Sequence, residues 1–467
     1  MLELWRLSAH ELAEGIREHR YSAREVIEAH LQRIEDVNPR VNAVAVVMID
    51  EARRAAAEAD ERQERGEQLG PLHGVPVTVK ESYDVAGTAT TRGVAAFADN
   101  IAPADCPIVE SLRDAGAIVI GRTNLPDFAT RLHTESGLHG ATVNPWGAEL
   151  SPGGSTGGDA AAVATGMAPI GIGGDSGGSL RVPASACGIT SLRTTPGVVP
   201  EASSLPGPPP SMAIQLFSSS GPVARRVNDL QVALSVIRRG SPRDPNWIPA
   251  ALEPRGVSGT RVAVTTDPCG LGVDAEVAQS VRRAADALES AGYHVTEVDP
   301  PMVLEAQKAF ESIVPVEIRL LMFDTIKRLG SAGVVRFVEG LLEIGPELDL
   351  REYAQALADR MTLCGAWTLF CDTYPIVLGP VSTELTWPAG YDQGGVDHIR
   401  RMLDSYGLTL AANVLAAPAV TVPSSKSRSG APIGVQLLGP RFSDATLLEA
   451  ARFIEEKIAP ITPIDPL

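Results

Sequence analysis

The stretch DAAAVATGMAPIGIGGDSGGSLRVPAS, residues 159–185, decides the fold of this chain. Its first part has the alanine-rich composition of a helix, and the run APIGIGG that follows it is typical of a buried strand. A glycine-rich loop with two serines comes after this strand. Helix and strand alternate in the same way on both sides of the stretch, which predicts an α/β fold with a largely buried sheet.

Segments further along the chain extend this pattern. The run VPVTVK (75–80) predicts a strand, IVESLRDAGA (108–117) a helix and AIVIG (117–121) another strand. Over about residues 301–400 the pattern becomes mostly helical and apolar, and it then returns to alternating strands and helices. The sequence therefore predicts a large α/β unit with a helical insertion.

We expect a single domain over residues 1–467, because no clear linker, repeat or low-complexity segment divides the chain. Two capping boxes, Ser8 to Glu11 and Ser22 to Glu25, each precede a helical apolar pattern and predict two helices near the N-terminus. The expected parts of the domain are N-terminal helices over 1–70, a core over 71–230 and a variable helical region over about 301–400.

Composition limits the class of protein. The chain has 467 residues, 44% of them hydrophobic, and a formal net charge of −17, which argues against a nucleic-acid partner. Five scattered cysteines without zinc-ligand spacing indicate a reducing compartment and no metal. The N-terminus is charged and polar, and the longest uncharged run, 405–425, contains Asn413 and Pro418. We therefore expect a cytoplasmic protein without a membrane span or a cofactor.

The Gly-Asp-Ser-Gly-Gly segment offers two candidate nucleophiles, Ser176 and Ser179. A trypsin-like site or an α/β-hydrolase elbow would select Ser176, and both schemes need a histidine base. None of the eight histidines lies in a segment that suggests this role, although His133 and His139, in a glycine-containing loop, remain candidate pocket residues. Neither scheme fits the sequence well, so we expect a different base.

Lysine can replace histidine as the base when burial or nearby positive charge lowers its pKa enough to leave it neutral. Lys80 ends the run VPVTVK, so its amine would emerge at the end of a buried strand; on that segment alone, a solvated lysine is the simpler interpretation. A second glycine-rich loop carries Ser155 and Thr156 in front of a strong helix. Two such loops and one upstream lysine are best explained as one site.

Taken together, these segments resemble the amidase signature family of hydrolases. The resemblance covers nearly the whole chain except the helical region of about 301–400. It implies an α/β fold with a mixed, mostly parallel β-sheet covered by helices on both faces. The segments that carry it are GVPVTVKESYDVAGTATTRG (74–93), IVIGRTNLPDF (118–128), NPWG (144–147), SPGGSTGGDAAAVATG (151–166) and GGDSGGSLRVPASACGI (173–189).

The resemblance implies a Ser–cis-Ser–Lys triad formed by Ser179, Ser155 and Lys80, in which Ser179 is the nucleophile. It also implies that the peptide bond between Gly154 and Ser155 is cis. The backbone N–H groups expected to form an oxyanion hole are those of Ser176, Gly177, Gly178 and Ser179. The residues expected to support the two loops are Gly154, Thr156, Asp175 and Arg181, the last two as a pair.

Some positions depart from the usual family pattern. Thr156 replaces a serine and keeps a hydroxyl, and Glu81 replaces the aspartate that commonly follows the lysine. Asp159 stands where a small residue is frequent, and its charge suits the first turn of the helix. Pro196 stands where an aromatic residue is expected, in a loop that often borders the substrate pocket. The change at Pro196 concerns the substrate pocket, and all of these departures leave the expected triad intact.

The implied function is hydrolysis of C–N bonds in neutral, fairly apolar amides through an acyl-enzyme, with carbamates (urethanes) and esters as further candidate substrates. The alternative is the glutaminase-like A subunit of a tRNA-dependent amidotransferase, which would need partner subunits. A catalytically silent binding protein is disfavoured, because Lys80, Ser155 and Ser179 are all present. The expected partner is the small-molecule substrate, and the expected state is a monomer or a homodimer.

Overall fold

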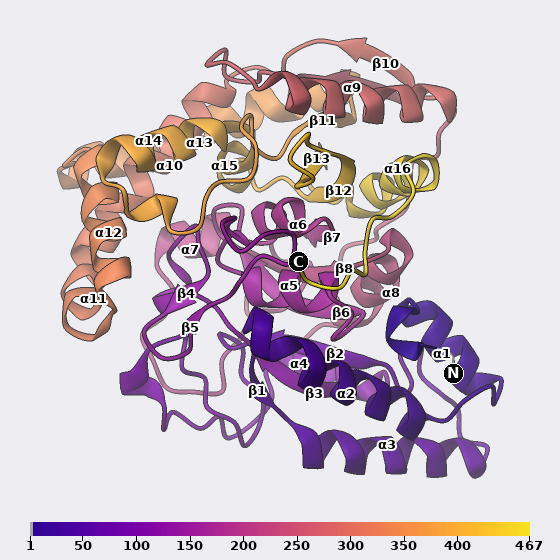
Figure 1. Cartoon of the computed structure of the whole chain (residues 1–467). Helices are drawn as coiled ribbons and strands as arrows, with labels where there is room; N and C mark the ends of the chain where they lie inside the picture. Colours follow the sequence, from indigo (N-terminus) through magenta and orange to yellow (C-terminus); the bar gives the residue numbers. More distant parts are fainter. Residues whose placement is uncertain (1–2) are drawn as a thin grey trace.

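A computed structural model describes residues 3–467 and has a large sheet at its centre (Figure 1). Its strands are β1 (Val44–Val47), β2 (Pro76–Lys80), β3 (Ile118–Thr123), β4 (Glu135–Ser136), β5 (Gly140–Ala141), β6 (Ile170–Asp175), β7 (Thr190–Arg193), β8 (Ser219–Ala224), β9 (Arg261–Val264), β10 (His294–Glu297), β11 (Ile376–Pro380), β12 (Ala419–Lys426) and β13 (Pro432–Leu438). Eleven of them form one sheet in the order β1-β3-β2-β6-β8-β7-β12-β13-β11-β9-β10, and β4 pairs with β5.

The predicted α/β fold with a mixed sheet is confirmed. Parallel pairs join β3, β2 and β6 and also β11, β9 and β10. The other six pairings of this sheet are antiparallel. The predicted parallel pairing therefore holds within these two groups of strands and not across the whole sheet. The connection between β12 and β13 shows why this pair is antiparallel. Only residues 427–431 join the two strands, and so short a connection cannot form the crossover that a parallel pair needs.

The helices surround the sheet. They are α1 (Ala9–Arg17), α2 (Ala23–Val41), α3 (Ile49–Glu64), α4 (Pro107–Asp114), α5 (Gly157–Ala164), α6 (Arg181–Cys187), α7 (Met212–Phe217), α8 (Val227–Ile237), α9 (Ala275–Ser290), α10 (Val303–Glu317), α11 (Phe323–Leu329), α12 (Ala332–Ile344), α13 (Leu350–Thr373), α14 (Val396–Ser405), α15 (Gly407–Val414) and α16 (Asp444–Lys457). Both predicted capping boxes are present, at the starts of α1 and α2.

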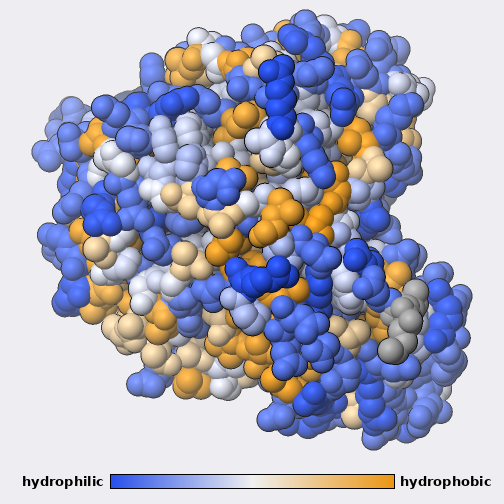
Figure 2. All heavy atoms as spheres, viewed as in Figure 1, coloured by the Kyte–Doolittle hydropathy of each residue, from blue (hydrophilic) through white to orange (hydrophobic). Residues whose placement is uncertain are grey.

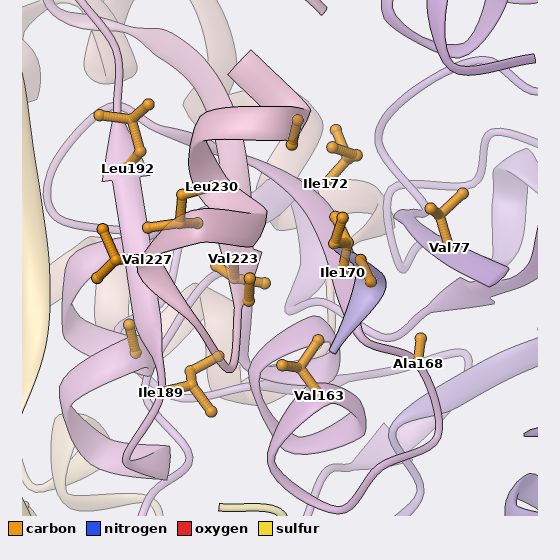
Figure 3. Close-up of a cluster of buried hydrophobic side chains, with 14 of the residues drawn as sticks. Val77, Val163, Ala168, Ile170, Ile172, Ile189, Leu192, Val223, Val227 and Leu230 are labelled. Atoms are coloured by element: carbon orange, nitrogen blue, oxygen red, sulfur yellow. The ribbon is translucent and has the colours of Figure 1, made fainter. Parts of the chain in front are cut away.

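Strand β6 shows how the sheet separates two helical layers. A Cβ added to Gly171 would lie 2.7 Å from Asp159 Oδ1, and one added to Gly173 would lie 2.4 Å from Thr156 Cγ2, so glycine lets α5 approach this face closely. Side chains alternate along a strand, so Ile172 points to the opposite face. The hydrophobic cluster shown in Figure 3 contains Ile172 together with Val227 and Leu230 of α8 and Val163 of α5.

The region of about 301–400 is mostly helical, as predicted. It contains α10 to α13, which lie together at one side of the molecule in Figure 1, and the first half of α14. The strand β11 interrupts it and joins the central sheet next to β9. The insertion is therefore tied to the sheet by its own strand.

The visible surface is mostly polar. Figure 2 shows that hydrophilic residues cover most of the visible face, with hydrophobic residues gathered near its middle. Among residues 3–467, no helix is both long enough and apolar enough to cross a membrane.

Candidate active site

The candidate site lies where β2 and β6 end. These two strands are parallel neighbours in the sheet, so their carboxyl ends meet at the same edge. Lys80 is the last residue of β2, and the loop after β6 carries Ser176 to Ser179. The loop that carries Ser155 leads into α5, which packs against β2 and β6. The sheet thus brings three segments that are far apart in the sequence to one place.

Lys80 and Ser155 are in direct contact. The Lys80 Nζ donates hydrogen bonds to Ser155 Oγ at 2.7 Å and to Thr156 Oγ1 at 3.0 Å. All three side chains are buried. The peptide bond between Gly154 and Ser155 is cis, as expected. Thr156, predicted only as a supporting residue of the loop, is thus a second partner of the lysine.

Ser179 lies beside this pair. Its backbone carbonyl accepts a hydrogen bond from the Thr156 N–H at 3.2 Å, so the two serine loops are joined directly. Ser179 is half-buried, whereas Ser155 and Lys80 are buried. Within residues 3–467 its hydroxyl donates no hydrogen bond to Ser155. The structure therefore gathers the three predicted residues in one site, with Ser179 nearest to solvent.

Burial changes the proton affinity of Lys80. It lowers the pKa of the amine from 10.5 to about 7, against the opposing effect of the negative charges of Asp159 and Asp175. A lysine with such a pKa is partly neutral near neutral pH, and the neutral amine is the form that can accept a proton. The environment of Lys80 is therefore suited to general-base chemistry.

Asp175 and Arg181 brace the loop after β6, as predicted. The Arg181 guanidinium donates to both oxygens of Asp175, at 2.9 and 3.0 Å, and both residues are fully buried. Burial alone would raise the pKa of Asp175, but the charge and hydrogen bonds of Arg181 hold it well below its usual range. The pair fixes the loop between β6 and α6, which contains Ser176 to Ser179.

The four N–H groups predicted as oxyanion donors differ in their hydrogen bonds. The N–H of Gly178 donates to Asp175 Oδ1 at 2.8 Å, so this group is engaged in bracing the loop. In the part of the chain that the structure describes, the N–H groups of Ser176, Gly177 and Ser179 donate to no protein acceptor. Three of the four predicted donors therefore remain free to receive an oxyanion.

Two further side chains hold the brace, and the sequence analysis missed both. The amide of Asn413 donates to Asp175 Oδ1 at 2.9 Å and accepts from Arg181 at 2.7 Å. Gln436 Oε1 accepts from Arg181 at 3.0 Å. The signal for Asn413 was its position as a polar residue in the uncharged run 405–425, because buried amides need hydrogen-bond partners.

Neither candidate histidine is placed as a base. His139 Nε2 lies 2.7 Å from Glu81 Oε2, next to the lysine in sequence, and His133 Nδ1 lies 2.9 Å from Ser151 Oγ. Within residues 3–467 neither ring forms a hydrogen bond with Ser179. In the same residues, no three His, Cys, Asp or Glu side chains are grouped as metal ligands would be.

Helices α10 and α15 form one wall of the site. A Cβ added to Gly177 would lie 3.0 Å from Phe310 Cζ and 3.8 Å from Leu410 Cδ2, so α10 and α15 reach the loop that carries Ser179. The ring of Phe310 stacks on that of Phe217, with centroids 6.2 Å apart. The surface beside the loop is therefore apolar on this side.

A narrow cavity lies on the other side of the serine loops. It borders Gly153 and Val182, and Trp387, Met402 and Tyr406 supply much of its apolar lining. The cavity volume is about 30 Å³, enough for one or two water molecules.

Known proteins resemble this chain over almost its full length. The Amidase family model matches residues 25–448. The chain is 39% identical over 456 residues to an indoleacetamide hydrolase of Bradyrhizobium diazoefficiens, a match that covers 97% of this chain and 87% of the relative. It is 30% identical over 485 residues to the A subunit of a glutamyl-tRNA(Gln) amidotransferase of Alkaliphilus metalliredigens, a match that covers 96% of each.

A solved structure of this family has a similar fold. A bacterial aryl acylamidase of the amidase signature family superposes with a TM-score of 0.84 at 25% sequence identity, over 98% of this chain and 96% of that chain. The family match, the sequence relatives and the fold thus agree with one another. The chain belongs to the Amidase family and is an amidase signature hydrolase that acts on amides.

Proposed function

We propose that this chain is a serine-type amidase in which Ser179, Ser155 and Lys80 form a proton relay. The observation that carries the proposal is the 2.7 Å hydrogen bond between buried Lys80 and Ser155, together with burial that lowers the pKa of the lysine to about 7. A neutral Lys80 accepts the Ser155 proton while Ser155 accepts that of Ser179. The activated Ser179 Oγ then attacks the substrate carbonyl.

The loop after β6 stabilises the intermediate. The carbonyl oxygen becomes an oxyanion, which the free N–H groups of Ser176, Gly177 and Ser179 receive. The C–N bond breaks, and the leaving amine takes the proton back from Lys80 through Ser155. Water, deprotonated by the same relay, then hydrolyses the acyl-enzyme and releases the acid.

We propose neutral amides with an apolar, preferably aromatic, group as substrates. The wall formed by the apolar side chains of Phe310, Leu410 and Phe217 supports this choice. The relative that hydrolyses indoleacetamide and the aryl acylamidase of similar fold are both named for amides that carry an aromatic group. Carbamates and esters also have a carbonyl carbon that Ser179 can attack, and the proposal includes them.

The second candidate is the glutaminase-like component of a tRNA-dependent amidotransferase. The full-length match to such a protein favours it, although the identity of 30% is lower than the 39% to the indoleacetamide hydrolase. This function predicts glutaminase activity that depends on partner subunits. Turnover of anilides by the isolated chain would speak against it.

The test is a panel of substrates that share one aryl amine: acetanilide-type amides of increasing chain length, the matching carbamate, and glutamine for comparison. We expect the purified chain to hydrolyse the anilides, with products identified by mass. Phe310→Ala removes part of the apolar wall and should raise the KM for the bulkier anilides by about tenfold while changing the acetanilide less. Activity on glutamine alone, or only after a partner is added, would overturn the proposal.

A further inference from the structure

Asp159 is a buried carboxylate beside the proposed relay. None of the proton transfers proposed above involves its charge. It is the third residue of α5 and lies one helical turn after Thr156, so both side chains point from the same face of the helix. Its two oxygens accept hydrogen bonds from the hydroxyls of Thr78, at 2.9 Å, and Thr123, at 2.6 Å. The side chain is thus held in one orientation on both sides.

The two threonines place this carboxylate next to Lys80. Thr78 and Lys80 are two residues apart on β2, so their side chains leave the same face of the strand. Thr123 is the residue on β3 that pairs with Lys80. Gly171 on β6 leaves room for the carboxylate, because a Cβ there would lie only 2.7 Å from Asp159 Oδ1.

The charge of Asp159 is not balanced by an arginine contact. The other carboxylate that acts on Lys80 is Asp175, and Arg181 neutralises it through two hydrogen bonds. Within residues 3–467, no lysine or arginine forms an ion pair with Asp159. Arg122, on β3, acts on it only at longer range. Lys80 is therefore the cation whose charge Asp159 is placed to balance.

The remaining charged groups near Lys80 are turned to other partners. Glu81, the next residue in the chain, is 2.7 Å from His139 Nε2. The guanidinium of Arg122 donates to the carbonyls of Tyr83 and Ala89. Asp159 is thus the nearby charged group best placed to act on the protonation of the lysine.

We propose that Asp159 is a positioning residue that sets how strongly Lys80 holds its proton, an inference that rests on the proposed amidase function. In acylation the Ser179 proton passes to Ser155, and the Ser155 proton passes to Lys80, which becomes an ammonium. The Asp159 carboxylate stabilises this ammonium and receives no proton itself. Without it, burial would leave the lysine too weak a base to accept the proton readily.

The electrostatics of the pair agree with this role. Burial raises the pKa of Asp159 from 3.8 to about 6, although the hydrogen bonds from Thr123 and Thr78 oppose the change. The carboxylate is therefore mainly ionised above about that pH, in the range where Lys80 titrates. Its charge raises the pKa of the lysine against the larger, opposite effect of burial.

The test uses Asp159→Asn and phenylmethylsulfonyl fluoride, because this probe reports activation of the serine without a known substrate. The Ser179 oxygen bonds to the sulfur and fluoride leaves. Inactivation rates are measured from roughly pH 5 to 9, and the modified residue is identified by mass. We expect the acid limb of the profile to move to lower pH by about one unit and the plateau rate to fall. An unmoved limb would overturn the proposal.

Asp229→Asn is the matched control. Asp229 is also buried, and burial raises its pKa too, but it accepts from the N–H groups of Ala9 and His10 at the start of α1. The acid limb of the inactivation profile of Asp229→Asn should coincide with that of the wild type. If Asp159→Asn does not fold, Asp159→Ser, which is smaller and also uncharged, gives the same comparison.

The two proposals fail in different ways. If phenylmethylsulfonyl fluoride does not modify wild-type Ser179, the proposed amidase mechanism fails. If it modifies Ser179 with a clear acid limb that neither Asp159 variant moves, only the role of Asp159 fails.

Discussion

At Lys80, burial and hydrogen bonding together prepare a lysine to work as a base. Burial removes water from the ammonium and lowers its pKa to about 7, while Ser155 and Thr156 hold the nitrogen in place at 2.7 and 3.0 Å. A solvated lysine would stay protonated at neutral pH and could not accept a proton. The function proposed for this chain therefore depends on the dry environment of one side chain.

The pH dependence of turnover follows from this state. Only neutral Lys80 accepts a proton, so kcat/KM should rise with pH through about 7 and fall as the lysine becomes protonated at lower pH. Lys80→Ala should lower kcat/KM by about 10²- to 10⁴-fold and remove this acid limb. The measurement is a pH–rate profile of both proteins on an anilide. A variant with an unchanged limb would exclude Lys80 as the base.

The sequence identified some residues of the site but not all of their contacts. Lys80 ends an apolar run, but only the two glycine-rich loops and the family resemblance made it the candidate base. Asp175 and Arg181 could be predicted because they flank the glycine-rich loop. The hydrogen bonds of Asp159 could not, because they depend on Thr78 and Thr123 from two neighbouring strands. Sequence places a charge in a helix turn but does not show which strand residues face it.

At the scale of elements, the loop between β6 and α6 is held by its own ion pair. Asp175 ends β6 and Arg181 begins α6, so their contact closes the loop at its base. Arg181→Ala would remove both guanidinium hydrogen bonds to the buried Asp175 and leave it only the more distant Arg193, at 3.7 Å, which should lower the free energy of unfolding by about 3–5 kcal/mol. Urea unfolding of the purified variant measures this loss.

The control for that variant is an exposed ion pair. Arg53 donates to Glu28 on the surface, where water screens the charges, so Arg53→Ala should unfold at nearly the same urea concentration as the wild type. Equal losses for the two arginines would contradict the bracing role of Arg181.

Elements near the site were easier to predict than the order of the sheet. The runs that became β2, β3 and β6 are apolar and bounded by glycine or polar residues, and their periodicity is local. Pairing is not local: β8 lies between β6 and β7, although it follows both in the chain. The short strand β1 and its antiparallel pairing with β3 were likewise not visible in the sequence pattern.

Over the whole molecule, the sheet and the helical region supply different parts of the site. The end of β2 carries Lys80, the loop after β6 carries Ser179, and the loop before α5 carries Ser155. Helices α10 and α15 bring Phe310 and Leu410 to the loop that carries Ser179. The motifs of the sheet region could be recognised in the sequence. The side chains of the apolar wall could not be predicted, because the helices that supply them carry no motif that indicates which side chain faces the site.

The most direct measurement is to identify the residue that carries the acyl group during turnover. The chain is mixed with an activated aryl ester, quenched in acid, digested and mapped by mass. The account predicts that the acyl group is on Ser179, and that Ser179→Ala carries none. An adduct on Ser176, or an adduct that persists in Ser179→Ala, would contradict it.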